Sequence, residues 1–131
     1  MSVNSRDQQL ISQRPEIFSA KTLETTSSFE AFQNQVLRPI LKFQNDLLVQ
    51  VFLSRINSRN QDFSALTLQK KQNILIGEFK TNTTLKQMLL GCVIGLLTTE
   101  EFKFYTTNTS KINKRIFSML KERLSDQWEK L

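Results

Sequence analysis

The chain has 131 residues, 39% of them hydrophobic and 23% charged, which is the composition of one ordinary globular domain and not of a disordered protein. Three glycines and two prolines argue against a fold of many strands and tight turns and favour a few long helices. The net charge of +6 is spread along the sequence, and the absence of histidine excludes the Ser-His-Asp and Cys-His catalytic sets.

The N-terminal region, residues 1–26, is predicted to be an arm on a helical bundle formed by residues 27–131, the two together making one domain. The arm contains a short helix, about Ser5 to Gln13, that ends near Pro15. Its apolar side chains are expected to hold it against the bundle or against a second subunit: Leu10, Ile11, Ile17, Phe18 and Leu23.

The segment Phe29–Ile56 has the longest helical pattern, and the rest of the chain is predicted to pack around it. One apolar stripe runs Phe29, Phe32, Val36, Ile40, Phe43, Leu47, Val51, and a second runs Leu37, Leu41, Leu48, Phe52, Ile56. Two stripes predict two packing surfaces, and both phenylalanines of the repeated Phe-Gln-Asn unit are expected to pack. Ser27 and Glu30 match a capping box at the start.

Pro39 interrupts this helical pattern. Inside a helix, proline removes one backbone hydrogen bond and crowds the carbonyl four residues earlier. The helix is therefore expected to kink between Gln35 and Arg38, or to break so that Pro39 opens a new helix. The apolar stripes continue across Pro39, which favours the kink.

Two further helices are predicted after a polar connection anchored by Phe63 and Leu66. In the first, capped by Thr67, the apolar side consists of Leu68, Ile74, Leu75 and Phe79, and Lys70, Lys71 and Lys80 lie elsewhere. The second, Leu85–Leu97, is apolar almost all round and is expected to be buried. Gly91 and Gly95 share one of its faces, which predicts a closely crossing helix there.

Two helices complete the chain. Thr98 and Glu101 form a capping box for a short helix, and the last helix begins around Asn108 to Ser110. Its apolar positions are three and four residues apart: Ile112, Ile116, Met119, Leu120, Leu124 and Trp128. The predicted fold is all-α, a compact bundle of five or six helices around a long central helix kinked at Pro39.

The polar side of the central helix is the first candidate binding site. Its two Phe-Gln-Asn units are eleven residues apart and therefore project within about 20° of each other. The candidate residues are Gln33, Asn34, Arg38, Gln44, Asn45 and Asp46. They are interpreted either as structural hydrogen-bonding groups around Pro39, or as a polar pocket or interface.

Three functions remain open. The leading hypothesis is a non-enzymatic binding or assembly module that self-associates, for example as a homodimer, because apolar faces are plentiful. The second is nucleic-acid binding through the basic face of the last helix, formed by Lys111, Lys114, Arg115, Lys121 and Arg123. The third is a small-molecule pocket or enzyme beside Arg38 and Pro39, with Asp46 and the amides.

The single cysteine, Cys92, lies in the most apolar helix and is expected to be an inert core residue. One cysteine without histidine forms no zinc site, and no phosphate-binding loop motif occurs, so neither a metal nor a cofactor is predicted. The N-terminus has no signal-peptide pattern and no apolar run spans a membrane. We therefore expect a cytoplasmic protein without membrane attachment.

Three stretches resemble a small family of uncharacterised bacterial proteins of Bacteroidetes-type genomes: Phe32–Asp46, Leu89–Phe102 and Asn113–Arg115. The similarity covers most of the chain and implies a cytoplasmic bacterial protein without bringing an established activity. Members sometimes carry the label glyoxalase. Familiar glyoxalases bind a metal through His and Glu on paired βαβββ modules, whereas this sequence has no histidine and no strand pattern.

Overall fold

The computed structural model describes residues 5–15, 28–56 and 62–131, and within these ranges every regular element is a helix. The all-α prediction is therefore confirmed. The elements are α1 (Ser5–Gln13), α2 (Ser28–Phe32), the π-helical turn η2 (Gln33–Leu37), α3 (Arg38–Ile56), the 3₁₀ turn η4 (Phe63–Ala65), α4 (Leu68–Thr81), α5 (Thr83–Ile94), α6 (Thr99–Thr107), α7 (Thr109–Ser125) and the 3₁₀ turn η5 (Trp128–Lys130).

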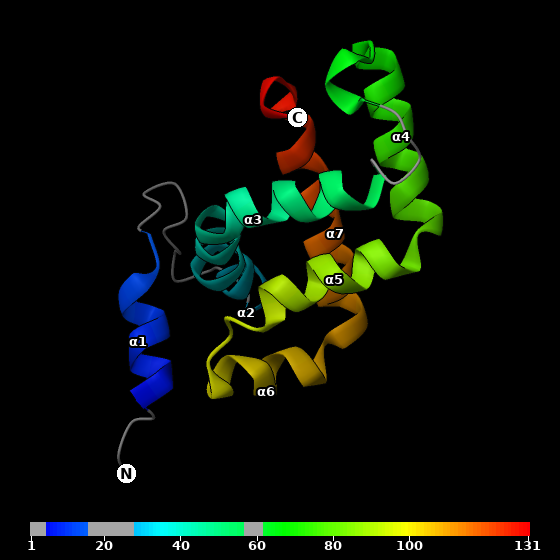
Figure 1. Ribbon diagram of the computed structural model, residues 1–131. Helices are drawn as coiled ribbons and strands as arrows, with labels where there is room; N and C mark the ends of the chain where they lie inside the picture. The colour runs from blue at the N-terminus through cyan, green and yellow to red at the C-terminus, as the bar shows by residue number, and fades with distance from the viewer. Residues whose placement is uncertain (1–4, 16–27, 57–61) are drawn as a thin grey trace.

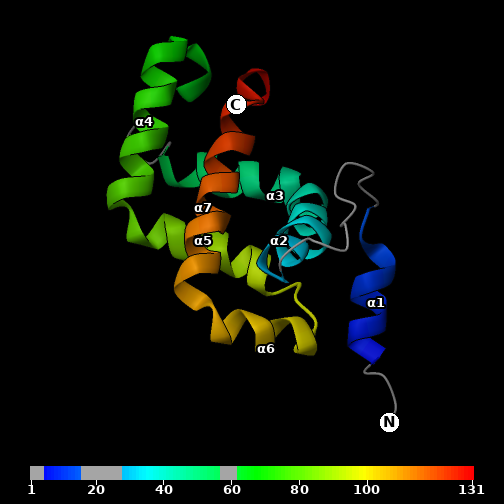
Figure 2. The ribbon, with the colours of Figure 1, turned by 180° about the vertical axis from the view of Figure 1, so that it is seen from behind.

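The helices form a bundle in which α3 packs against α5 and α7 crosses them (Figure 1). Seen from the opposite side, α7 lies in front of both helices (Figure 2). Helix α4 packs against α5 and α7, and α6 packs against α7. Among the described helices, none combines the length and the apolar character that a membrane span requires.

The chain stays helical from Ser28 to Ile56, with a π turn immediately before Pro39. There the backbone N–H of Arg38 donates to the carbonyl of Gln33, five residues back. The wider π turn removes the conflict between the proline ring and the preceding turn of the helix. The irregularity thus falls where the kink was predicted, and the helix does not break at Pro39. The capping box predicted at Ser27 lies outside the described residues.

The two apolar stripes of this segment are not buried to the same extent. All five members of the second stripe, Leu37 to Ile56, are buried. In the first stripe, Phe32, Val36 and Ile40 are buried. Phe43 and Leu47 are each 49% exposed, so the prediction that they pack in the core is wrong.

Helix α5 is buried on one side only, contrary to the prediction. Leu85, Leu89 and Val93 belong to the core, whereas Met88 is exposed. The expected close crossing at the glycines is also wrong, because a Cβ added to Gly91 would have no neighbour within 4 Å. A Cβ on Gly95 would meet only the Gly91 carbonyl of the same helix, at 3.1 Å.

Substituting Gly91 with alanine should therefore stabilise the protein. A glycine inside a helix costs up to about 1 kcal/mol relative to alanine, and nothing opposes the added methyl group here. We expect Gly91→Ala to raise the free energy of unfolding by up to about that amount in urea titrations. Gly95→Ala, where the space is tighter, is the control and should gain less. A destabilised Gly91→Ala protein would show that a neighbour occupies this face.

Helix α4 begins and is capped as predicted, but its buried face differs. The Thr67 hydroxyl accepts from the Lys70 backbone N–H at 3.2 Å. Lys71, expected outside, is only 7% exposed, and its Nζ lies 5.6 Å from the centre of the Phe63 ring. Leu68, expected inside, is exposed. The ammonium group of Lys71 therefore makes a cation–π contact with the buried Phe63 of η4.

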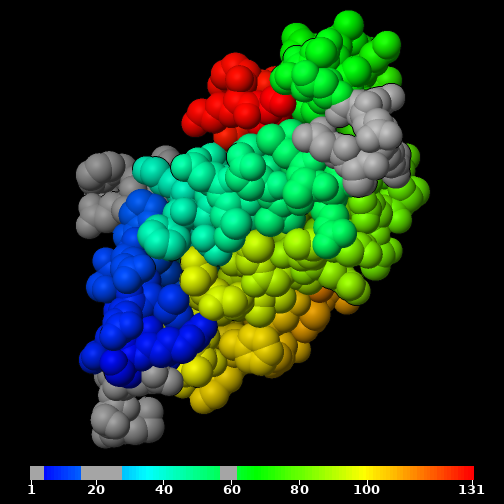
Figure 3. All heavy atoms as spheres, in the orientation of Figure 1, coloured from blue at the N-terminus to red at the C-terminus, as the bar shows by residue number. Residues whose placement is uncertain are grey.

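Polar contacts, more than apolar ones, hold α1 against the bundle, where it lies on α3 and on the α5–α6 region (Figure 3). Arg6 donates to the carbonyls of Gly95 and Leu97 at 2.7 and 3.0 Å. Asp7 accepts from the backbone N–H and the hydroxyl of Thr99 at 3.1 and 2.7 Å. Ile11, predicted to pack, is 56% exposed, and Ile17, Phe18 and Leu23 lie outside the described residues.

Arg14 completes this attachment. Its guanidinium donates to both carboxylate oxygens of Glu101 at 2.5 and 2.6 Å and to the Leu96 carbonyl at 3.1 Å. Glu101 also closes the predicted capping box with Thr98, which is confirmed. Arg6 and Arg14 bind carbonyls at the C-terminal end of α5, which carries a partial negative charge. Asp7 binds an N–H group at the N-terminal end of α6, which carries a partial positive charge. Each contact is therefore electrostatically favourable.

Candidate functional site

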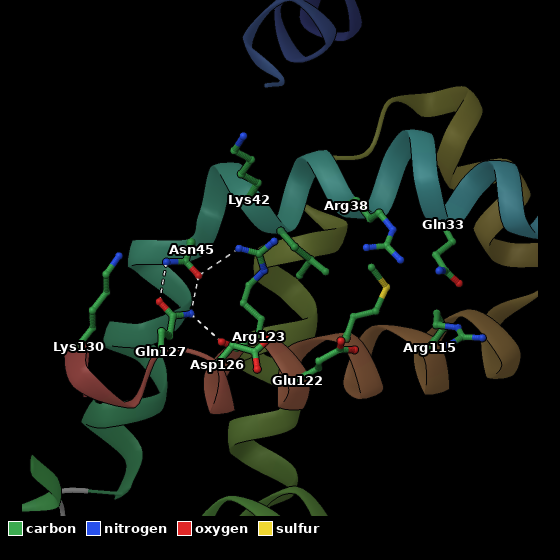
Figure 4. A pocket seen from close by; sticks show the side chains of 12 residues that line it. Gln33, Arg38, Lys42, Asn45, Arg115, Glu122, Arg123, Asp126, Gln127 and Lys130 are labelled. Atoms are coloured by element: carbon green, nitrogen blue, oxygen red, sulfur yellow. Dashed lines mark hydrogen bonds between the residues drawn. The ribbon is translucent and has the colours of Figure 1, made fainter. Parts of the chain in front are cut away.

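A groove of about 540 Å³ lies between the η2–α3 segment and α7 (Figure 4). This volume is in the range of small-molecule sites, which is about 300–1,000 Å³. The groove is lined by Gln33, Arg38, Leu41, Lys42, Asn45, Arg115, Met119, Glu122, Arg123, Asp126, Gln127 and Lys130.

The lining of the groove is strongly cationic. Five of the residues carry a positive charge, and they are Arg38, Lys42, Arg115, Arg123 and Lys130. Two carboxylates, Glu122 and Asp126, leave a surplus of three positive charges. In the described part of the chain, none of these seven groups forms an ion pair. A concave surface of one sign concentrates counter-ions and attracts ligands of the opposite charge.

The π turn places two of the lining residues on the same side of the helix. Gln33 and Arg38 are five residues apart and would point about 140° apart in a regular α-helix. In a π turn, residues five apart are joined by the backbone hydrogen bond and lie one above the other. Pro39 therefore shapes the groove indirectly, because it favours the turn that brings Gln33 beneath Arg38.

Arg123 contributes a guanidinium that lacks a carboxylate partner among the described residues. Burial, and then the positive charge of Arg38, lower the pKa of Arg123, while Asp126 partly opposes the shift. Among the described residues, its side chain donates one hydrogen bond, from Nη1 to Oδ1 of Asn45 at 3.4 Å. Arg38 donates from Nε to Asn34 at 3.1 Å, which leaves the ends of its guanidinium available. The planar guanidinium groups of Arg38 and Arg123 thus both line the same groove (Figure 4).

An amide pair bridges the two walls of the groove. Asn45 donates to Oε1 of Gln127 at 3.0 Å, and Gln127 donates back to Oδ1 of Asn45 at 2.8 Å. Gln127 also donates to the Arg123 carbonyl at 3.0 Å, and its side chain is buried. These reciprocal bonds fix α3 to the C-terminal end of α7 and hold the two walls of the groove at a set separation.

The residues predicted on the central helix divide between the groove and the scaffold. Gln33, Arg38 and Asn45 line the groove. Asn34 accepts from Arg38 and orients it. The other two serve elsewhere: Gln44 donates to the Cys92 carbonyl of α5 at 2.9 Å, and Asp46 is exposed beside Asn45.

The five basic residues predicted on the last helix do not share one face. Arg115 and Arg123 line the groove, while the Nζ of Lys111 lies 4.2 Å from the centre of the Phe29 ring. Lys121 and Arg123 are two residues apart and point about 160° away from each other. Lys114, seven residues before Lys121, shares its side. The polar lining residues that the sequence did not predict are Lys42, Glu122, Asp126, Gln127 and Lys130.

The described residues offer few other candidates for a reactive group or a metal site. Cys92 is half-buried, and burial raises the pKa of its thiol, which lowers the thiolate fraction at neutral pH. In the ranges that the structure describes, no three acidic or cysteine side chains cluster as metal ligands.

Comparisons with protein-family models, with curated proteins and with solved structures found no match to this chain. The family resemblance of the sequence therefore stays a prediction, and the function is argued from the groove alone.

Proposed function

We propose that this chain is a binding module for a small anionic molecule and that the groove between α3 and α7 is its binding site. One observation carries the proposal: five cationic side chains and two carboxylates share a groove of about 540 Å³, and no ion pair forms among them within the described residues. Cations left without carboxylate partners favour an anion that supplies the missing charge.

The chemistry of the donors favours an oxyanion such as a phosphomonoester. A guanidinium offers parallel N–H donors that match two oxygens of a phosphate or carboxylate. Arg38 and Arg123 bring two such groups close enough for the charge of one to lower the pKa of the other. An anion with two charges would relieve that repulsion. The described residues carry no histidine, so we propose binding and not catalysis.

A confined ligand fits the groove better than a nucleic-acid backbone does. Nucleic-acid binding requires cations along an extended surface. Here Lys114 and Lys121 lie on another side of α7 from Arg123, so the cations of α7 do not form one continuous surface. Nucleic-acid binding therefore remains the alternative that a mobility-shift assay at low salt tests.

The direct experiment is isothermal titration calorimetry with 2-hydroxyethyl phosphate at low salt. We expect binding that weakens as salt is added, because the groove acts through charge. The absence of binding at low salt both to this phosphomonoester and to its amino analogue O-phosphoethanolamine would reject the proposal. The variants that locate the site are treated in the Discussion.

Self-association is a second candidate, and it is favoured by two exposed side chains of α3. Phe43 and Leu47 are four residues apart, so they are neighbours on the helix surface, and each is 49% exposed. If they form an interface, Phe43→Ser combined with Leu47→Ser should lower the molar mass measured by light scattering after size exclusion. The exposed Leu68→Ser serves as the control. A monomeric wild-type protein at high concentration would contradict this candidate.

A further inference from the structure

Two carboxylates lie in the cationic groove, and a purely anionic ligand gains nothing from them. Glu122 and Asp126 are four residues apart on α7, so they share one side of the helix at about 6 Å along its axis. Both are exposed and both line the groove. In the described part of the chain, neither forms an ion pair with any of the five cations beside it.

The cations come from both walls of the groove, whereas both carboxylates come from the C-terminal end of α7. Figure 4 shows Arg38 on the α3 side and the guanidinium of Arg123 reaching from α7 toward Asn45 of α3, while Glu122 and Asp126 lie along α7. Asp126 acts on Arg123 over distance, since its charge partly opposes the lowering of the Arg123 pKa. Charges that line one groove without pairing leave room between them for a ligand that bears both signs.

We infer that the ligand is a small zwitterion, in which a phosphate or similar dianion binds between Arg38 and Arg123 and an ammonium group binds between Glu122 and Asp126. This inference rests on the proposed function and specifies its ligand class. The arrangement selects against ligands of a single sign. A simple anion leaves the two carboxylates facing its own charge, and a simple cation meets the arginines.

Two probes that differ in a single group test the inference. O-phosphoethanolamine carries an ammonium group where 2-hydroxyethyl phosphate carries a hydroxyl. In calorimetry at low salt, we expect the wild-type protein to bind the zwitterion about tenfold more tightly, which corresponds to about 1.4 kcal/mol. In the variant Glu122→Gln with Asp126→Asn, the two probes should bind about equally well. The reason is that 2-hydroxyethyl phosphate gains affinity when the carboxylates are removed, whereas O-phosphoethanolamine loses affinity.

A matched control removes the same kind of charge outside the groove. Glu129→Gln changes an exposed carboxylate of η5 that does not line the groove, and it should leave the tenfold preference intact. Equal wild-type affinities for the two probes would overturn the zwitterion inference and leave the proposed function standing. Failure of both probes to bind would reject the proposed function itself. A lost preference in Glu129→Gln would also overturn the inference, because net charge would then explain the selectivity.

Discussion

Replacing Arg38 and Arg123 with glutamine is expected to weaken binding of 2-hydroxyethyl phosphate by about a hundredfold at low salt. Each change removes charge-assisted hydrogen bonds, and a loss of about 1.4 kcal/mol per arginine corresponds to about tenfold. Calorimetry on the two single variants and on the double variant measures both the losses and their additivity. Because the charge of Arg38 acts on Arg123, any departure of the double variant from this additive hundredfold loss measures the coupling between the two arginines.

The same substitutions should leave the fold intact. Burial and the charge of Arg38 both lower the pKa of Arg123, so the charged form of Arg123 is disfavoured in the folded protein. Arg123→Gln is therefore expected to keep or raise the thermal midpoint while anion affinity falls. Residues that serve binding commonly show this opposition between stability and function. A large loss of stability in Arg123→Gln would indicate a structural role instead.

Lys114→Gln with Lys121→Gln provides the matched control. It removes two positive charges from the same helix, α7, but from residues that do not line the groove. The control should bind the phosphate nearly as well as wild type. Equal weakening in the control and in the arginine variant would show that net charge, not the groove, governs binding. The control pair also tests the nucleic-acid alternative, for which these lysines should matter.

Local periodicity predicted most of the fold because it determines which helix positions share a side. In α7, Ile112, Ile116, Leu120 and Leu124 repeat every four residues, and all of them are buried. Helix caps could be predicted as well, because the side chains of Thr67 and Thr98 accept hydrogen bonds from backbone N–H groups only three residues later in the chain. What failed depended on which sides of a helix its neighbours cover, as for Phe43 and Leu47 of α3 and for Leu68 of α4. Periodicity shows which positions share a side, but not whether another helix covers that side.

The candidate site was visible in the sequence only as two unconnected halves. Gln33, Arg38 and Asn45 were predicted from the central helix, whereas Arg115 and Arg123 belonged to a separate nucleic-acid hypothesis. Nothing local indicates that these halves face each other, because tertiary packing sets the relation between α3 and α7. The residues that join them, such as Gln127, follow the last apolar position of α7 and have no periodic pattern.

The attachment of α1 leads to the second large effect. Arg14→Ala is expected to lower the free energy of unfolding by about 3 kcal/mol in urea titrations. Arg14 and Glu101 form a bidentate pair whose side chains are only 13% and 16% exposed. Removing the arginine leaves the Glu101 carboxylate buried without its cation. Lys103→Ala on α6, the helix that carries Glu101, is the control. The side chains of Lys103 and its partner Glu100 are 73% and 74% exposed, so this ion pair should contribute little to stability.

The pH dependence of the same pair separates its electrostatic part from packing. Burial alone would raise the pKa of Glu101, but the hydrogen bonds from Arg14 and from the Thr98 backbone outweigh burial, and the pKa is lowered from 4.5. A folded-state pKa below the unfolded value stabilises the protein above the unfolded pKa, and this stabilisation is lost as the pH falls through the folded pKa. The stability difference between wild type and Glu101→Gln should therefore be full at neutral pH and shrink in acid below about 4. A difference that stays constant down to pH values well below 4 would assign the stabilisation to shape and hydrogen bonding alone, and α1 would then be held without help from the charge of Glu101.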